Sequence, residues 1–86
     1  MSDTMYVFHA SWCNPCKQYA PIVDEVEKVT GLPVHRIDVE EFPGLTKDYN
    51  VSTVPTVVLV GEDSLERDRL TGVHTFNELY DMARPF

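Results

Sequence analysis

The two cysteines of the chain, Cys13 and Cys16, stand three positions apart between two different hydrophobic patterns. Before them, Met5–His9 is a short apolar run of β-branched and aromatic residues, which is typical of a buried strand. After them, apolar residues recur at three- and four-residue steps from Pro15 to about Thr30, which predicts an amphipathic helix. The thiols are therefore expected where a strand passes into the first turn of a helix.

The rest of the chain continues to alternate strands and helices. Val34–Val39 is the next expected strand, and strand, helix and strand in this order form a right-handed parallel crossover. The further expected elements are a short helix over Pro43–Tyr49, a central strand at Thr56–Val60, a polar edge strand around Arg67–Leu70, and a last helix opened by a capping box of Thr75 and Glu78. The sequence thus predicts a single α/β domain over residues 1–86, with a four-stranded mixed sheet in the order β-α-β-α-β-β-α flanked by helices.

Size and charge restrict the functions open to such a chain. A domain of 86 residues buries only about 60% of the surface of its unfolded chain, so large substrates are expected to bind at its surface. The net charge of −7 argues against nucleic acid and anionic membranes as partners. The sequence contains neither an apolar run of membrane-spanning length nor an opening secretory signal, and a cytoplasmic location is expected.

The position of the cysteine pair predicts redox chemistry. Free backbone N–H groups and the helix dipole stabilise a thiolate at a helix N-terminus, so Cys13 is the expected nucleophile toward disulfides. Cys16 lies one turn further along and is expected to be less exposed and to resolve the mixed disulfide. Lys17 adds a nearby cation and Pro15 stiffens the turn between the sulfurs, so both are expected to tune the pair.

Half of a zinc site is the alternative interpretation of a Cys-x-x-Cys pair. Zinc needs about four converging ligands. The remaining soft ligands, His9, His35 and His74, are scattered along the chain, whereas a Cys-x-x-Cys beside a strand-helix-strand unit favours redox chemistry. No metal and no bound cofactor are expected.

Two segments resemble the thioredoxin family. The stretch Trp12-Cys13-Asn14-Pro15-Cys16-Lys17 is similar to the active-site segment of that family, with Asn14 where glycine is usual, and Thr53-Val54-Pro55-Thr56 is similar to its cis-proline loop. The resemblance implies the thioredoxin fold, with Pro55 in the cis form and packed against the cysteine pair. It also implies that the Val54 backbone pairs with an extended substrate. The docking patch it implies is formed by Trp12, Asn14, Val54 and Gly72.

The chain departs from this family in three respects. The family usually begins with another strand and helix, which the four residues before Met5 cannot encode, so a minimal, N-terminally shortened member with Val34–Val39 at a free sheet edge is expected. Val7 stands where the family has a buried aspartate, and Arg36 where it has a lysine. His9 replaces a tryptophan, and the hypothesis is that its imidazole substitutes as a base or electrostatic partner.

The resemblance implies a thiol-disulfide oxidoreductase that mainly reduces protein disulfides through a Cys13/Cys16 dithiol cycle. Its implied partners are disulfide-containing proteins and a thioredoxin-reductase-like electron donor, with the protein working as a monomer in electron transport. A glutaredoxin-like reductase using glutathione is an alternative, although Trp12 and the segment Leu70–His74 do not fit that family. A non-enzymatic interaction module of the same fold is the other alternative, and it would not need both thiols.

Overall fold

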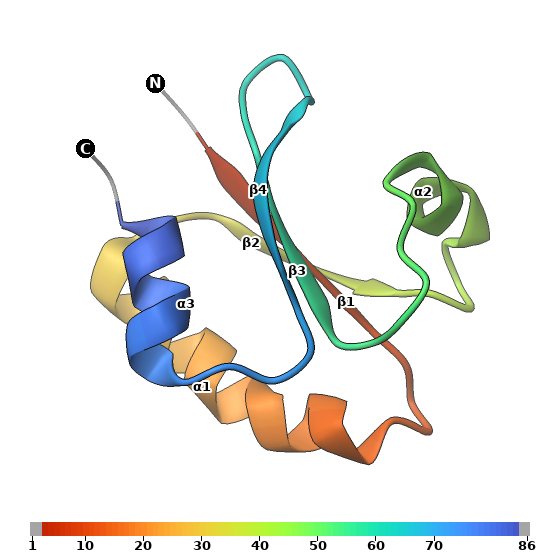
Figure 1. Ribbon diagram of the computed structural model, residues 1–86, viewed down its shortest axis with the longest axis horizontal. Helices are drawn as coiled ribbons and strands as arrows, with labels where there is room; N and C mark the ends of the chain where they lie inside the picture. Colours follow the sequence, from red (N-terminus) through yellow and green to blue (C-terminus); the bar gives the residue numbers. More distant parts are fainter. Residues whose placement is uncertain (1–2, 85–86) are drawn as a thin grey trace.

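The computed structural model describes residues 3–84 and has the seven elements that the hydrophobic patterns predict (Figure 1). In chain order these are β1 Thr4–His9, α1 Asn14–Thr30, β2 Val34–Asp38, α2 Pro43–Asp48, β3 Thr56–Val60, β4 Glu66–Thr71 and α3 Phe76–Ala83. Their types and order are as expected, and the bounds differ by one or two residues. The largest extension is in β4, where Glu66 and Thr71 pair with β3 beyond the stretch of Arg67–Leu70.

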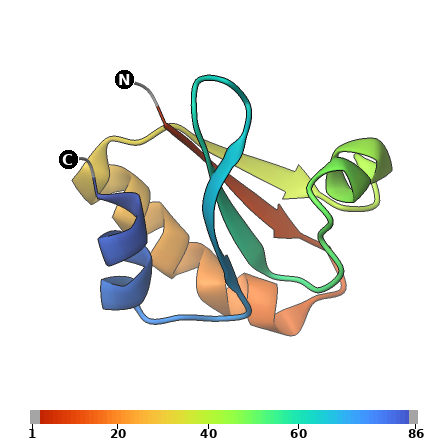
Figure 2. The same ribbon diagram turned by 45° about the horizontal axis from the view of Figure 1, so that its top comes forward.

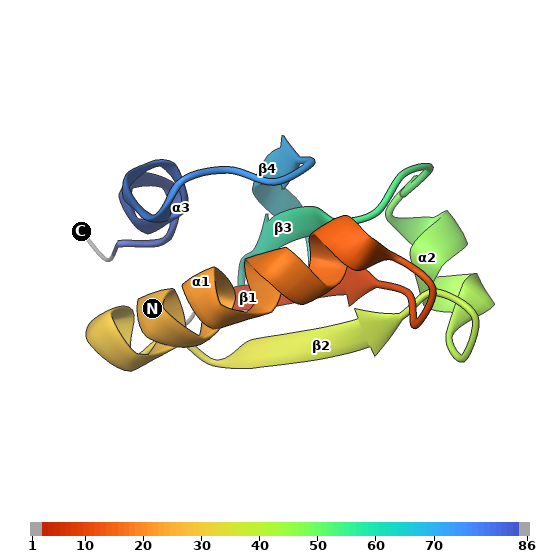
Figure 3. The same ribbon diagram turned by 90° about the horizontal axis from the view of Figure 1, so that it is seen from below.

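The four strands form one mixed sheet in the spatial order β2-β1-β3-β4, which Figure 3 shows from below. β1 is parallel to β2, in a register that places Val7 beside Arg36 and His9 beside Asp38. β3 is antiparallel to both β1 and β4. Within the described residues β2 therefore forms a free edge of the sheet, as expected.

Alternation along β1 divides the core into two halves. Met5 and Val7 point to the face covered by α1 and α3, where they pack with buried residues of both helices. Phe8 points to the opposite face and packs with Ile37 and Val58, against side chains of α2 and the loop after it. α3 lies beside α1 on its face of the sheet (Figure 1). The strictly alternating side chains of an extended strand explain this two-sided core.

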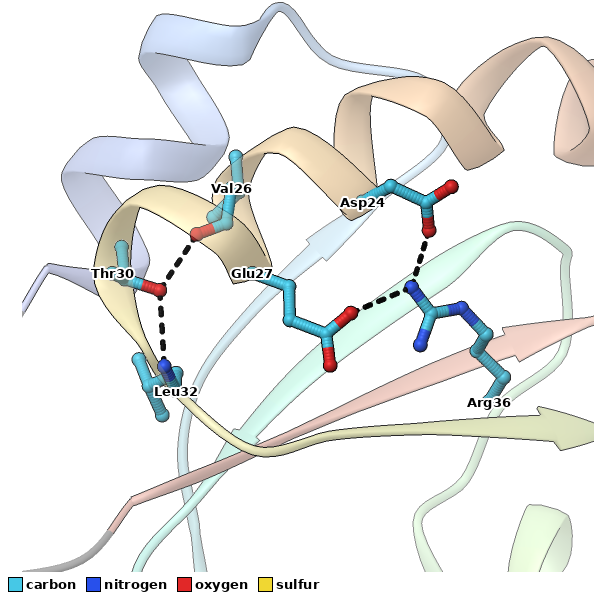
Figure 4. Close-up of polar contacts among 6 residues, drawn as sticks. All are labelled: Asp24, Val26, Glu27, Thr30, Leu32 and Arg36. Carbon is cyan, nitrogen blue, oxygen red and sulfur yellow. Dashed lines mark hydrogen bonds and ion pairs between the residues drawn. The ribbon is translucent and has the colours of Figure 1, made fainter.

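Helix ends follow the capping chemistry expected from the sequence. α1 runs through Pro21 and ends at Gly31, which has the left-handed φ of 71° that glycine adopts without a steric penalty. The Thr30 hydroxyl donates a hydrogen bond to the Val26 carbonyl at 2.7 Å and accepts one from the Leu32 amide at 3.3 Å (Figure 4). These bonds fix the turn that leads from α1 into β2.

The amino end of α3 carries the predicted capping box. The Thr75 hydroxyl accepts a hydrogen bond from the Glu78 amide, and the Glu78 carboxylate accepts one from the Thr75 amide. Leu79 and Ala83 are the buried residues of this helix. The box therefore sets the start of α3 so that these two side chains reach the core.

An ion-pair network joins the edge strand β2 to α1. The Arg36 guanidinium donates hydrogen bonds to the carboxylates of Asp24 and Glu27 (Figure 4). Burial opposes the charge of Arg36, but the bonds to Glu27 and Asp24 outweigh it and raise the pKa of the guanidinium. The arginine thus crosses from the strand to the helix instead of lying along the open edge.

The loop between β3 and β4 projects beyond the sheet, as Figure 2 shows. Its conformation includes Ser64 with a positive φ of 66° and a hydrogen bond from the Gly61 amide to the Leu65 carbonyl. Arg69 of β4 binds the Glu66 carboxylate on its own strand and the Tyr49 carbonyl after α2. In residues 3–84, no helix is both long enough and apolar enough to cross a membrane.

Candidate active site

The two sulfurs meet at the amino end of α1. Cys13 and Cys16 form a disulfide with a Cα–Cα distance of 5.3 Å. Cys13 is the N-cap residue, with extended φ and ψ of −90° and 103°, and its Sγ accepts a hydrogen bond from the Cys16 amide at 3.2 Å. Because this amide has no partner within the helix, it is available to stabilise negative charge on Sγ when the disulfide is opened.

Cys13 is slightly more buried than Cys16, whereas the sequence predicts Cys16 to be the less exposed of the two. Cys13 is 4% exposed and Cys16 is 8% exposed, so the expectation that Cys16 is less exposed is wrong for the disulfide form. Both cysteines pack in one small cluster with Ala10, to which Val39 and Val54 contribute. Cys16 also borders a cavity beside the helix.

The proline loop lies directly against Cys13. The Val54–Pro55 peptide bond is cis, as the resemblance implies, and Pro55 is buried. The Val54 carbonyl oxygen lies 3.8 Å from Cys13 Sγ. Gly72, with a φ of 87°, donates its amide to the Pro55 carbonyl at 2.8 Å, so the segment after β4 holds the loop in place.

A shallow hollow of about 150 Å³ opens beside the disulfide. Trp12 is 63% exposed and shares the wall of the hollow with Val54. The rest of the lining comes from the end of β2, α2 and the segment before Pro55, namely Val39, Thr46, Val51, Ser52 and Thr53. An extended chain crossing the Val54 backbone would therefore have an apolar surface next to the sulfurs.

Further residues that the sequence assigns to the site lie in the first turns of α1 and after β4. Asn14 and Pro15 are exposed in the first turn of α1, and Lys17 is exposed one turn later. Gly72 reaches the site through the hydrogen bond from its amide to the Pro55 carbonyl. Of the implied docking patch, Trp12 and Val54 line one hollow, and the structure does not place Asn14 and Gly72 in that lining.

Beneath Cys16 lies a second cavity of about 140 Å³. It is lined by Val7 and His9 of β1, Arg36 of β2, Pro55, and the α1 residues Cys16, Tyr19, Ala20 and Val23. Burial raises the pKa of Tyr19 to about 12, an effect that the His74 backbone opposes and Glu78 reinforces. The structure therefore brings His9 and Arg36, both singled out in the sequence, to the same side of the redox pair.

Across residues 3–84 there is no group of three or more His, Cys, Asp or Glu side chains placed to hold a metal ion. The thiols are joined to each other as a disulfide. Once this bond is reduced, a thiolate of the pair at the helix N-terminus can attack another disulfide.

Sequence reasoning missed two contributors to the site. Val39 packs against the cysteine cluster, and Tyr19 lines the cavity under Cys16. The signal for Tyr19 is its spacing of three residues from Cys16 on one helix, which places both on the same face. The position of Val39 depends on the pairing of β2 with β1, which no local pattern specifies.

Comparisons with known proteins agree with this geometry. The Thioredoxin family model matches residues 2–84. The thioredoxin of Chlamydia caviae is 33% identical over 67 residues, covering 77% of this chain and 65% of that protein. The thioredoxin of Rickettsia felis is 33% identical over 76 residues, covering 86% and 71% of the two chains.

A solved structure shows the same architecture. A mutant thioredoxin from Halobacterium salinarum superposes with a TM-score of 0.88 at 32% identity, over 94% of this chain and 71% of that one. This chain spans 65% of the Chlamydia protein and 31% of the M-type chloroplast thioredoxin of Spinacia oleracea. With a helix-capping Cys-x-x-Cys disulfide, a cis-proline loop beside it and a family model that extends from residue 2 to residue 84, the chain belongs to the thioredoxin family.

Proposed function

We propose that the protein is a thiol-disulfide oxidoreductase that mainly reduces disulfides in other proteins. The observation that carries the proposal is the Cys13–Cys16 disulfide at the amino end of α1, with the Cys16 amide 3.2 Å from Cys13 Sγ. After reduction of the pair, Cys13 attacks a substrate disulfide and forms a mixed disulfide. Cys16 then attacks Cys13, which releases the second substrate thiol and restores the observed disulfide.

The substrate is proposed to bind as an extended segment across the Val54 backbone. Trp12 and Val54 supply an apolar wall next to Cys13, and the bond from Gly72 to Pro55 supports the loop from behind. Asn14 and Pro15 border the sulfurs on the exposed first turn of α1. Backbone pairing provides affinity without requiring a particular substrate sequence, which suits a reductase of several proteins.

The electron source is proposed to be a thioredoxin-reductase-like protein, in a cytoplasmic setting that keeps thiols reduced. The exchange needs no bound cofactor, because both electrons reside in the dithiol pair. We further propose that residues 1–86 work as one domain and as a monomer. To test the electron source, the oxidised protein is mixed with a pre-reduced reductase of this kind, and single-turnover reduction of the Cys13–Cys16 bond is measured.

The decisive experiment is reduction of insulin by dithiothreitol in the presence of wild-type protein, Cys13→Ser and Cys16→Ser. Wild-type protein is expected to accelerate precipitation of the insulin chains, and both variants are expected to lose turnover. Cys16→Ser should accumulate a mixed disulfide between Cys13 and insulin, which mass spectrometry detects, whereas Cys13→Ser should not. Turnover by Cys13→Ser at the wild-type rate would overturn the proposal.

A further inference from the structure

The cavity under Cys16 contains one side chain suited to accept a proton near neutral pH. Its lining is apolar except for Cys16 itself, His9, Tyr19 and Arg36. Tyr19 is a neutral phenol in this range, because burial raises its pKa to about 12. Arg36 remains a cation, since the guanidinium keeps its proton in proteins. By elimination, the imidazole of His9 is the remaining candidate acceptor among the residues that line the cavity.

The strand pleat directs His9 toward Cys16. Met5 and Val7 point to the α1 face of the sheet, and His9 follows at the same alternation. The half-buried His9 and Cys16 accordingly border the same cavity. The cavity volume of about 140 Å³ is large enough for a water molecule, which can carry the proton between the two side chains.

The charged groups around the cavity come from β2 and α1. Arg36, on β2, faces the cavity, but its charge is bound by Asp24 and Glu27 of α1. Asp38 of β2 is the register partner of His9, and parallel partners share a face of the sheet. The Asp38 carboxylate is fixed by a hydrogen bond from the Glu40 amide at 2.8 Å. The carboxylates of Asp24, Glu27 and Asp38 outnumber the Arg36 guanidinium, so these four groups together carry a net negative charge.

We propose that His9 accepts the thiol proton of Cys16 during resolution of the mixed disulfide. The inference rests on the proposed oxidoreductase function. The proton moves from Cys16 Sγ to the imidazole, and the thiolate attacks Cys13 Sγ. The Cys13–Cys16 bond forms as the bond from Cys13 to the substrate sulfur breaks. The substrate leaves as a thiolate and is then protonated, so it has gained two electrons and the dithiol pair has lost two.

A two-phase assay separates this step from the attack by Cys13. Reduced protein is mixed with dithiobis(nitrobenzoate), a disulfide that releases coloured thionitrobenzoate at each exchange. The first release reports attack by Cys13, and the second reports attack by Cys16 on the mixed disulfide. Cys16→Ser is expected to show the first release alone, which identifies the two phases.

His9→Gln is expected to keep the first phase at the wild-type rate. Its second phase should slow at least roughly tenfold at neutral pH, since general base catalysis contributes about 10²–10⁴-fold. The pH profile of the second phase should differ between wild type and His9→Gln, whereas the profile of the first phase should be the same in both. His9→Phe provides a second variant of different shape with the same expectation.

His35→Gln is the matched control, because His35 is exposed on the neighbouring strand and faces Tyr6 on the other side of the sheet. It should leave both phases unchanged. A second phase with wild-type rate and pH dependence in both His9 variants would overturn the role of His9 while leaving the proposed function intact. Absence of the first phase in wild-type protein would instead contradict the proposed function.

Discussion

The backbone amide of Cys16 donates a hydrogen bond to Sγ of Cys13 over 3.2 Å, so the first cysteine caps the helix that contains the second. In the reduced protein this amide and the neighbouring helix N-terminus stabilise a thiolate at Cys13 more than at Cys16. Iodoacetamide is therefore expected to alkylate Cys13 at least roughly tenfold faster than Cys16 near neutral pH. Peptide mass spectrometry after short reaction times measures the two rates.

Denaturant provides the control for this alkylation experiment. In the unfolded chain the helix N-terminus is absent, and the two cysteines should react at similar rates. Equal rates in the folded protein would contradict the assignment of Cys13 as the nucleophile.

Tyr19 is expected to make the stability of the protein sensitive to alkaline pH. Burial raises its pKa from 10.0 to about 12 in the folded chain, so the unfolded state releases the phenol proton first. The contribution of the neutral Tyr19 phenol to the free energy of unfolding is complete below pH 10 and is lost as pH rises from 10 to about 12. It amounts to roughly 2–3 kcal/mol. Urea unfolding of Tyr19→Phe and wild type across this range should show a smaller alkaline loss in the variant. Parallel losses in the two proteins would contradict the prediction.

Thr75→Ala is expected to destabilise the protein by about 1 kcal/mol, because the amino end of α3 loses its capping hydroxyl. The Glu78 amide would then lack its hydrogen bond, and the helix that buries Leu79 would fray at its start. Chemical denaturation measures the change in the free energy of unfolding. Ser11→Ala, at an exposed turn position, serves as the control and should have little effect. An equal effect of both substitutions would argue against a specific role of the cap.

Arg36→Gln is expected to cost at most about 1 kcal/mol, since the pairs with Asp24 and Glu27 are partly exposed. The cost should shrink at high salt, which screens exposed charges. Arg67→Gln is the matched control, because its pair with Asp3 is single and 3.8 Å long. Unfolding in urea at low and high salt measures both effects. If Arg36→Gln lowered the free energy of unfolding by the same amount at low and high salt, the role of Arg36 would instead be packing of its aliphatic stem.

The fold could be predicted because each element carries its own local signal. Thr56–Val60 is continuously apolar and is buried along its whole length, and Gly31 marks the end of α1 as expected. The capping box of Thr75 and Glu78 defines α3 to the residue. The bounds of β4 were one residue short at each end, because the charged Glu66 has little strand propensity and both end residues are paired only through β3.

The site could be predicted where its chemistry is encoded in adjacent residues. The spacing of Cys13 and Cys16 at a strand-to-helix turn indicates the redox pair by itself. The cis form of Pro55 came from resemblance, because sequence composition does not distinguish it from a trans proline. The cavity that joins His9, Tyr19 and Arg36 depends on three elements packing together, and the burial of the two cysteines depends on Val39 and Val54. Such long-range contacts have no local signature.

The two edges of the sheet differ in a way that matters for engineering. β4 presents a run of alternating charge from Glu66 to Arg69, which disfavours pairing with a further strand. β2 lacks such a run, and Arg36 is turned back onto α1. A strand grafted by design, for example in a split reporter that reassembles on this scaffold, should therefore be placed beside β2, where it would lengthen the sheet at the end farthest from β4.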